Sequence, residues 1–369
     1  MLCMVPPPRP SAPANLYALS DAEVGKLLSS WDEPTFRAKQ LRSWVYEKGS
    51  TSFADMLNLP KGLRTKLAEA ATLGEMSLAQ EQVSTDGTQK RLWRCADGAL
   101  IESVLMPYDD NRRTACISSQ VGCAMGCTFC ATGQMGFKRD LSEAEIFEQA
   151  ARFSAELRAK GERLSNVVFM GMGEPFRNYD AVLGAARRIM ADLGIGARHI
   201  TISSVGVVPG ILRFAEEGLE LKLAISLHEV DDRRRSAMMP VNRKHKLAEL
   251  LAACHTYVLR TGRRVSFEWA LIAGVNDDVG TARELARLLA GLPRCHVNLI
   301  PLNPTSGFGG RPAALPAARA FVDELGKHGI PATVRVRRGI DIDAGCGQLA
   351  DAASKEAASS ASAASSQST

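Results

Sequence analysis

Three cysteines in one short stretch are the residues whose types and spacing point most directly to chemistry. Cys123, Cys127 and Cys130 lie in the segment VGCAMGCTFCATGQMGFKRDL, with three residues between the first two and two between the last two. Three thiolates on one short loop can bind three corners of a cubane iron–sulfur cluster and leave the fourth iron without a protein ligand. Such an open iron is a site where a substrate can chelate.

Two other kinds of metal site also use clustered cysteines. A structural zinc site needs a fourth ligand that closes a tetrahedron, and no His or Cys follows at the usual zinc-ribbon spacing. An electron-transfer ferredoxin usually has a fourth cysteine nearby, which this segment lacks. The spacing therefore favours a cluster with an open iron, while a non-catalytic iron–sulfur or zinc binding module stays open as an alternative.

The segments around these cysteines alternate between two patterns. Apolar, β-rich stretches recur six times, and helical stretches such as residues 142–160 lie between them. The six stretches span residues 114–121, 165–175, 199–209, 221–228, 263–272 and 295–304. Strands that alternate with helices form parallel βαβ units, so six units predict an α/β fold, a partial (β/α)6 barrel. In such barrels the loops at the carboxyl ends of the strands build the site, and the three cysteines follow the first strand.

The two ends of the chain differ in composition from its middle. Residues 1–15 are rich in proline and residues 350–369 are mostly Ala and Ser, so both segments are predicted to be disordered. Residues 16–88 are predicted to form a small helical domain with basic faces, which are either solvated or an RNA-binding surface. The candidate N-caps of its helices are Asp21, Asp32 and Ser52.

A β-hairpin is predicted between the helical domain and the barrel. Residues 89–113 begin with alternating apolar and polar residues around Asp97-Gly98, a strong signal for a tight turn between two strands. This hairpin extension leads into residues 114–349, which are predicted to form the barrel and a cysteine-containing loop at its end.

Composition and charge limit the class of protein. The chain has 369 residues, 46% hydrophobic and 23% charged, enough to bury a substantial core. Lys and Arg number 45 against 40 for Asp and Glu, a mild excess that permits a polyanionic partner without requiring one. Neither a signal peptide nor a membrane-length apolar run stands out, so we expect a cytoplasmic protein whose nine cysteines stay reduced.

The cysteine spacing is similar to that of radical S-adenosylmethionine (SAM) enzymes, in which the amino and carboxylate groups of SAM bind the fourth iron. From about residue 33 to residue 349 the sequence resembles the RlmN/Cfr family of radical SAM RNA methyltransferases and, within it, the RlmN branch. The resemblance rests on FRAKQLRSWVYEKG, LPKGLRTKL, ISSQVGCAMGCTFCATGQMGFKRDL, VVFMGMGEP, ISLH, NLIPLNP and DIDAGCGQL. It implies a radical SAM barrel, a 4Fe-4S cluster on the three cysteines, and S-adenosyl-L-methionine as the second cofactor.

The same resemblance implies a SAM pocket at the exits of successive strands. Its members here are Gly173, Glu174, Ser203, Ser226, Leu227, His228 and Asn303. The glycines of residues 171–175 permit close approach of a ligand, and the Glu174 carboxylate can accept a hydrogen bond from an ammonium or hydroxyl group. From the residues alone, a plain turn at 171–175 and ordinary structural roles for the Ser and His side chains stay open.

The resemblance assigns the decisive chemistry to Cys116 and Cys346. One SAM methylates Cys346, and a second is cleaved at the cluster to a 5′-deoxyadenosyl radical that takes hydrogen from the S-methyl group. The resulting carbon radical adds to C2 of adenine. After electron loss, Cys116 takes the proton from the substituted carbon, and a Cys116–Cys346 disulfide releases the RNA. Glu102 matches a position that the family treats as a proton acceptor, although a Glu at a strand edge is often simply solvated.

The alternative for Cys116 and Cys346 is a buried structural thiol. Such a role is expected for the four remaining cysteines, Cys3, Cys95, Cys254 and Cys295. Glycine on both sides of Cys346 favours a flexible or closely approached loop instead. The family pattern there is Ala-Ala-Cys-Gly, whereas this chain has a glycine at position 345, which we expect to loosen the loop.

The resemblance also implies partners. The expected substrates are an adenosine in the peptidyl transferase loop of 23S rRNA and an anticodon-loop adenosine in tRNA, and the expected reductant is an electron donor such as flavodoxin. We expect a monomer. Basic residues suited to phosphates are Arg233, Arg234, Arg235, Arg335, Arg337 and Arg338. Methylation at C8, as in the Cfr branch, stays open, because the choice of carbon depends on how adenine lies relative to Cys346.

Overall fold

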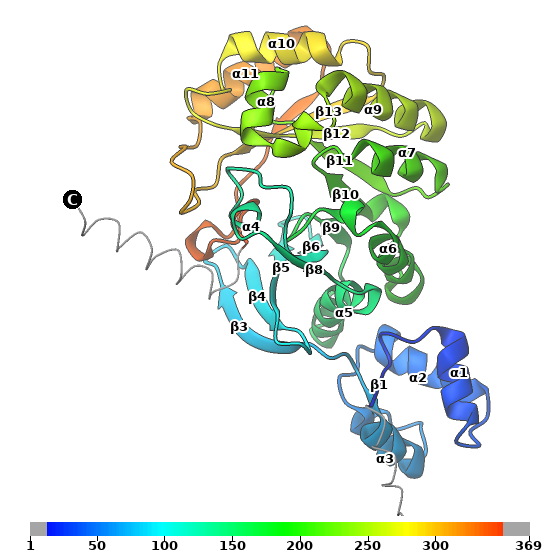
Figure 1. Cartoon of the computed structure of the whole chain (residues 1–369). Helices are drawn as coiled ribbons and strands as arrows, with labels where there is room; N and C mark the ends of the chain where they lie inside the picture. Colours follow the sequence, from blue (N-terminus) through cyan, green and yellow to red (C-terminus); the bar gives the residue numbers. More distant parts are fainter. Residues whose placement is uncertain (1–12, 350–369) are drawn as a thin grey trace, which may run out of the picture. The chain divides into compact units, whose positions relative to one another are not determined.

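The computed structural model describes residues 13–349, which belong to two compact units (Figure 1). The smaller unit comprises the chain up to Glu75 together with Ser154–Glu162, and the larger one Met76–Phe153 and the chain from Arg163 onward. Of the segments predicted to be disordered, residues 1–12 and 350–369 lie outside the described residues, while Ala14–Asn15 form strand β1. Within residues 13–349, no helix is long and apolar enough to cross a membrane.

The smaller unit is mostly helical. Its elements are β1 (Ala14–Asn15), α1 (Asp21–Ser29), α2 (Phe36–Arg42), the π-helical turn η1 (Ser43–Glu47), η2 (Phe53–Asp55), α3 (Lys61–Ala70) and β2 (Ala71–Thr72). The N-cap of α1 is Ser20, whose side chain accepts a hydrogen bond from the Glu23 N–H, so the expected cap at Asp21 was wrong by one residue. Ser52 caps η2 as predicted, whereas α2 follows Thr35 and not Asp32.

A ten-stranded sheet runs through the larger unit in the order β14-β13-β12-β11-β10-β9-β6-β5-β4-β3. Its strands are β3 (Ser77–Val83), β4 (Gln89–Arg94), β5 (Leu100–Pro107), β6 (Arg113–Cys116), β9 (Asn166–Phe169), β10 (Ile200–Ser204), β11 (Lys222–Ser226), β12 (Val265–Leu271), β13 (Cys295–Pro301) and β14 (Ala332–Val334). Neighbours from β6 to β14 pair in parallel, and those from β3 to β6 pair antiparallel. The six predicted parallel strands and the partial barrel are confirmed, and β14 adds a short parallel strand that the sequence did not predict.

Helices connect the consecutive parallel strands, as the alternation of patterns predicted. They are α5 (Glu143–Ala159), α6 (Tyr179–Leu193), α7 (Val208–Glu216), α8 (Asp232–Met238), α9 (Leu247–Thr261), α10 (Val279–Leu289) and α11 (Leu315–Lys327), with shorter turns η3 (Pro175–Arg177), η4 (Ala197–His199) and η5 (Pro240–Arg243). A further turn, η6 (Ile340–Ile342), follows β14. Each of the longer helices after β9 buries one apolar stripe; in α6, for example, Val182, Leu183 and Ile189 are buried. The polar residues at the carboxyl ends of the strands are therefore held by a packed framework.

Residues 114–121, predicted as one strand, form two. β6 ends at Cys116, and β7 (Gln120–Gly122) pairs antiparallel with β8 (Phe137–Asp140) in a separate sheet. A glycine permits this arrangement, because Gly122 has φ +74° and a Cβ there would lie 1.9 Å from the Gly136 carbonyl oxygen. The β7–β8 pair therefore brackets the loop that carries the three clustered cysteines.

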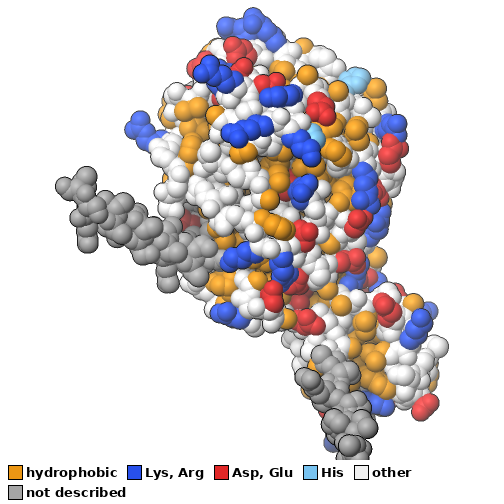
Figure 2. All heavy atoms as spheres, viewed as in Figure 1, with side chains coloured by type: hydrophobic (Ala, Val, Ile, Leu, Met, Phe, Trp, Pro, Cys, Tyr) orange, Lys and Arg blue, Asp and Glu red, His pale blue; other side chains and the backbone are white. Residues whose placement is uncertain are grey.

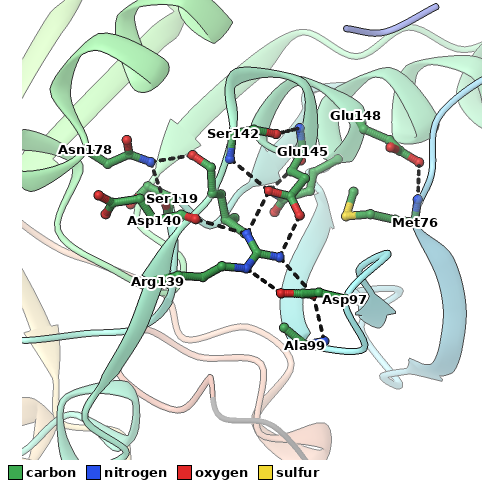
Figure 3. A network of polar contacts seen from close by, with 12 residues as sticks. Met76, Asp97, Ala99, Ser119, Arg139, Asp140, Ser142, Glu145, Glu148 and Asn178 are labelled. Carbon is green, nitrogen blue, oxygen red and sulfur yellow. Dashed lines mark hydrogen bonds and ion pairs between the residues drawn. The ribbon is translucent and has the colours of Figure 1, made fainter. Parts of the chain in front are cut away.

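The antiparallel strands begin with β3, earlier than the predicted hairpin, and β4 pairs with β5 around the Asp97-Gly98 turn as predicted. Figure 3 shows how Arg139 on β8 joins this turn to α5. Its Nε donates to Asp97 Oδ2 at 2.7 Å and its Nη2 to Glu145 Oε1 at 2.8 Å. The Arg139 guanidinium lowers the pKa of Asp97 to about 2. The strand that follows the cysteine loop is thus fixed to both neighbouring elements.

Candidate active site

The three clustered cysteines lie between β7 and the short helix α4 (Ala131–Gln134). Cys123 directly follows β7 and Cys130 precedes α4, so regular structure holds both ends of the loop. Cys123 and Cys127 are buried and Cys130 is half-buried, and all three line one cavity at the carboxyl ends of the barrel strands. A Cβ at Gly133 would lie 3.0 Å from the Cys127 backbone, so a glycine there lets α4 pack closely on the loop.

Burial controls the protonation of these thiols. It raises the pKa of Cys123 to about 12 and the pKa of Cys127 well above its ordinary value, and the neighbouring thiols of the loop add to the shift at Cys127. Burial also raises the pKa of Cys130. A bound metal would remove the protons, because a coordinating cysteine binds as a thiolate. The donor set therefore fits a soft, thiolate-binding metal group.

The arrangement of possible ligands distinguishes kinds of metal site. Across residues 13–349, no three His, Cys, Asp or Glu side chains are grouped so that they could hold a single metal ion. A structural zinc site needs four ligands around one point, whereas a cubane cluster takes its thiolates at separate corners.

Six of the seven residues assigned to the SAM pocket line the same cavity as the three cysteines. These six are Gly173, Glu174, Ser203, Ser226, His228 and Asn303. They lie at or just beyond the carboxyl ends of β9, β10, β11 and β13, where a parallel barrel brings its functional loops together. Leu227 does not line the cavity; its side chain is fully buried, and its N–H donates to the Glu268 carbonyl at 3.0 Å.

Glu174 is a buried carboxylate held by backbone groups. Its Oε1 accepts a hydrogen bond from the Phe176 N–H at 3.0 Å, and its Oε2 accepts one from the Val205 N–H at 2.8 Å. Burial nevertheless raises the pKa of Glu174 to about 7. Each oxygen keeps a second lone pair, so the group can still accept a hydrogen bond from a ligand in the cavity.

The two glycines before Glu174 are required by packing within the protein. A Cβ at Gly171 would lie 2.7 Å from the Ile117 carbonyl oxygen, and one at Gly173 would lie 2.6 Å from the Gln120 side chain. Gly173 also has φ +102°, a conformation that other residues rarely adopt. These glycines therefore let the segment pack against the residues that follow β6, a reason that the sequence did not reveal.

His228 is buried, neutral and oriented by the backbone. Its Nδ1 accepts a hydrogen bond from the Ala270 N–H at 2.8 Å, so Nε2 carries the proton. Burial lowers the pKa of His228 to about 3. The residue has φ +60°, and the Phe129 ring lies edge-on with its centroid 4.9 Å away. A strained backbone held this firmly in a cavity wall is typical of functional sites.

Cys346 lines two cavities. One contains the three clustered cysteines, and the other contains Cys116. The loop is held on both sides of Cys346, because the Asn303 Nδ2 donates to the Cys346 carbonyl at 3.0 Å and the Ala131 N–H donates to the Gly347 carbonyl at 2.7 Å. The Asn303 Oδ1 has no hydrogen-bond partner, although the side chain is buried.

Gly345 does not loosen this loop as expected. Its N–H donates to Gln348 Oε1 at 3.1 Å. A Cβ at this position would lie 2.6 Å from the Asn303 Nδ2 and 2.7 Å from Gln348 Oε1. The glycine therefore brings both side chains closer to the backbone next to Cys346.

Arg335 lies close to Cys346 and Cys116. Its Nη1 is 3.6 Å from Cys346 Sγ, and the negative charge that Cys346 can carry is the largest cause of the raised pKa of Arg335. Cys116 ends β6 and is buried, which raises its pKa to about 12; the Arg335 charge opposes that shift. Arg335 therefore favours the thiolate form of Cys116, and it contacts the Cys346 sulfur directly.

Glu102 is in the core and not solvated. Its side chain is about 5% exposed, and Lys90 Nζ lies 3.4 Å from its Oε1. Its backbone carbonyl accepts a hydrogen bond from Ser118 Oγ, which in turn accepts one from the Met172 N–H. Glu102 lines neither of the two cysteine cavities. The alternative of a solvated edge residue was thus wrong.

Sequence reasoning missed Glu268 and the place of Arg335. Glu268 is buried in β12 and lines the three-cysteine cavity; its Oε2 has no hydrogen-bond partner, and burial raises its pKa. A lone acidic residue inside the apolar run VSFEWAL was the available signal. The position of Arg335 beside Cys346 depends on the path of the chain after β14, which no local pattern encodes.

The arginine run on α8 does not present three free cations. Arg235 is fully buried, and its guanidinium donates to the carbonyls of Leu227 and Val205 and to Asn242 Oδ1. Arg234 pairs with Glu229 at 2.9 Å. The proposal of a phosphate contact at Arg235 was wrong, because its guanidinium ties the ends of β10 and β11 together.

The remaining cysteines fit the structural role expected of them. Cys95, Cys254 and Cys295 are buried free thiols, as predicted. Burial raises the pKa of Cys254 to about 12, which makes it unreactive. Cys3 lies outside the described residues.

Comparison with known proteins identifies relatives of both units. Residues 14–73 match the family described as "Ribosomal RNA large subunit methyltransferase N-terminal domain", and residues 117–286 match "Radical SAM superfamily". The chain is 48% identical to "Dual-specificity RNA methyltransferase RlmN 1" of Myxococcus xanthus, covering 91% of this chain and 94% of that protein. It is 45% identical to "Dual-specificity RNA methyltransferase RlmN" of an Anaeromyxobacter species, over 93% and 92% respectively.

A solved structure supports the same fold. The crystal structure of a radical SAM methyltransferase from Sphaerobacter thermophilus superposes with a TM-score of 0.87 at 47% identity. The match covers 91% of this chain and 99% of that one. The partial barrel described above is thus the fold of an experimentally determined relative.

Proposed function

Because the chain belongs to the RlmN family of radical SAM RNA methyltransferases, we propose that it methylates C2 of an adenosine in 23S rRNA and of an anticodon-loop adenosine in tRNA. One observation carries the proposal: Cys346 lines both the cavity of the three clustered cysteines and the cavity of Cys116. A thiol in that position can receive a methyl group on one side and deliver a carbon to RNA on the other.

The first cavity fits a 4Fe-4S cluster with SAM. Cys123, Cys127 and Cys130 bring three possible thiolate ligands to one cavity. The unpartnered oxygens of Asn303 and Glu268 are acceptors for an ammonium or hydroxyl group of SAM. When bound, the cluster and SAM supply the methyl group and the one-electron cleavage that generates a carbon radical.

The chain's own residues prepare Cys346 for this chemistry. The Arg335 guanidinium lies 3.6 Å from its sulfur, the atom that must act as the nucleophile, and Asn303 fixes its backbone. Cys116 must lose its proton before it can act as a base; burial raises its pKa to about 12, and the nearby Arg335 charge opposes that rise. A disulfide between Cys116 and Cys346 then releases the product and has to be reduced before the next turnover.

The remaining parts of the proposal concern Glu102 and the partners. Glu102 does not line the cavities, so we assign it a supporting role through Ser118 and Lys90, and a proton-acceptor role requires a relay. The enzyme works as a cytoplasmic monomer and takes electrons from a donor such as flavodoxin.

The test is anaerobic incubation of the reconstituted protein with methyl-labelled SAM, a reductant and protein-free 23S rRNA, followed by nucleoside mass spectrometry. We expect 2-methyladenosine, and none from Cys346→Ala or Cys116→Ala. Cys295→Ala is the matched control, since it removes a buried thiol that lines neither cysteine cavity. Recovery of 8-methyladenosine would move the enzyme to Cfr-type chemistry, and SAM cleavage without a modified base would contradict the proposed substrate.

A further inference from the structure

Basic side chains gather at the amino ends of β10 to β13, opposite to the ends that carry the clustered cysteines. Lys222 begins β11, and Arg263 and Arg264 directly precede β12. Together with Arg198 and His296 they line a cavity of about 560 Å³, here named the basic cavity. The amino ends of barrel strands ordinarily contribute to stability and not to binding, so an open cationic cavity there requires an explanation.

The positive charge of the basic cavity is only partly neutralised. Glu220 lies 2.8 Å from Arg198 and 3.5 Å from Arg263, so two arginines share one carboxylate. In the part of the chain that the structure describes, neither the Lys222 nor the Arg264 side chain forms a hydrogen bond or ion pair. Burial and the charge of Arg264 lower the pKa of Lys222. Crowded cations of this kind favour an anion between them.

The inner end of the basic cavity meets the reactive cysteines. Met170 and Arg335 line both this cavity and the cavity of Cys116 and Cys346. Glu268 lines the basic cavity and the three-cysteine cavity. Because Arg335 is 3.6 Å from Cys346 Sγ, a group bound in the basic cavity lies next to the residue that carries the methyl group in the proposed reaction.

Tyr108 extends the basic surface toward Cys346. Its ring lines the cavity of Cys116 and Cys346, with the Arg112 guanidinium 4.4 Å and the Arg338 guanidinium 4.5 Å from its centroid. The charge of Arg112 also contributes to the lowered pKa of Lys222. Cations therefore line both the basic cavity and the cavity of Cys116 and Cys346, and they do not converge on one point.

We propose that the basic cavity binds the phosphodiester backbone of RNA and that the target nucleotide reaches Cys346 from the amino ends of the strands. The inference rests on the proposed RNA methyltransferase function. A chain of phosphates fits better than one small anion, because the cations are spread over two cavities that share lining residues. The opposite end of the barrel is less suited, since Arg235 is buried and Arg234 is paired there.

The test compares RNA affinity between matched charge variants of the full chain. The first variant is Lys222→Gln with Arg264→Gln. The control is Lys246→Gln with Arg319→Gln, which removes the same charges from exposed side chains near the starts of α9 and α11, toward the carboxyl ends of the strands. Binding of a 23S rRNA fragment containing the peptidyl transferase loop is measured by fluorescence anisotropy over a range of salt concentrations.

We expect the first variant to bind RNA about tenfold more weakly, with a slope of log K against log salt smaller by about 1.4 to 1.8, as for two lost phosphate contacts. The control should change neither quantity. Glu220→Gln should do the opposite, with tighter binding and a steeper slope, because it leaves Arg198 and Arg263 without their shared carboxylate. A gain of affinity cannot result from misfolding.

Unchanged affinity and slope in the first variant, or a loss confined to the control, would overturn the inference. Methylation of Cys346 by SAM without RNA, read by peptide mass spectrometry, tests the proposed chemistry separately and should be equal in all variants. Absence of methyl-Cys346 in every variant would contradict the proposed function, whereas methyl-Cys346 with unaltered RNA binding would contradict the basic cavity alone.

Discussion

At the scale of single residues, we expect Arg335 to assist Cys346 as a nucleophile. A cysteine accepts a methyl group as a thiolate, and a guanidinium 3.6 Å from its sulfur stabilises that form. For Arg335→Met we expect Cys346 to react with iodoacetamide about tenfold more slowly, since a charge-assisted contact worth about 1.4 kcal/mol is lost. The rate is read from the Cys346 peptide by mass spectrometry. Arg335→Lys keeps the charge and should retain most of the rate; an unchanged rate in Arg335→Met would refute the role.

Glu102 offers a second test at this scale. Removing one partner of a buried ion pair leaves the other charge poorly compensated, so Glu102→Gln should lower the free energy of unfolding by about 3 kcal/mol. Adding Lys90→Met should recover part of this loss, as measured by urea unfolding. If Glu102 only supports the fold, methylation returns with stability in the double variant. A stable but inactive double variant would instead assign the carboxylate a part in proton transfer.

The sequence could reveal a site residue only where the residues that share its role lie near it along the chain. Cys123, Cys127 and Cys130 lie on one loop, so their spacing alone predicted a shared site. Glu268 and Arg335 reach the cavities from β12 and from the chain after β14, and their roles depend on strands that meet only in the folded sheet. Spacing along the chain does not contain that information.

At the scale of elements, the β7–β8 pair holds the cysteine loop, and two glycines provide a matched test of it. Both Gly122 and Gly136 have positive φ, but a Cβ at Gly122 would lie 1.9 Å from the Gly136 carbonyl oxygen, whereas one at Gly136 meets no atom within 4 Å. Gly136→Ala should therefore cost about 1 to 2 kcal/mol from its backbone conformation alone. Gly122→Ala should cost more, because β7 and β8 must also separate.

Thermal unfolding measures the stability of the two glycine variants. Iron content after reconstitution measures how well the cysteine loop still binds iron. We expect Gly122→Ala to have the lower Tm and to bind less iron, with Gly136→Ala close to the parent protein in iron. Equal losses in both variants would show that the loop does not depend on the β7–β8 pairing.

Elements were predictable where their pattern is periodic. The six parallel strands and their connecting helices follow from alternating apolar runs, and the β4–β5 turn follows from Asp97-Gly98. The division of residues 114–121 into β6 and β7 could not be predicted. It depends on the close approach of Gly122 to Gly136, which is a contact between separate segments. Strand β3 was missed because its largely exposed side chains carry no apolar face.

At the scale of the whole molecule, net charge conceals where the charge lies. The excess of five positive charges is small, and Figure 2 shows basic side chains interspersed with acidic and hydrophobic ones on the face in view. The basic cavity becomes visible only when the sheet brings together the amino ends of four strands. A composition of this kind neither reveals nor excludes an RNA-binding surface.

The pH dependence of stability should reflect two buried groups with opposite effects. The pKa of His228 falls to about 3, so between pH 3 and the ordinary value near 6.5 the unfolded chain binds more protons and acidification destabilises the fold. The pKa of Glu174 rises to about 7, so between its ordinary value of 4.5 and pH 7 the folded chain binds more protons and acidification stabilises it. Over most of this range the two contributions oppose each other.

Removing either group should therefore change the slope of the free energy of unfolding against pH, for the metal-free protein, in a known direction. Between pH 6.5 and 4.5, His228→Gln removes the destabilising contribution of acid, and Glu174→Gln removes the stabilising one. Each change in slope is at most about 1.4 kcal/mol per pH unit, the value for one proton. Urea unfolding at several pH values measures both slopes. If the two variants gave the same slope of unfolding free energy against pH, burial would not have shifted the pKa of either group as described.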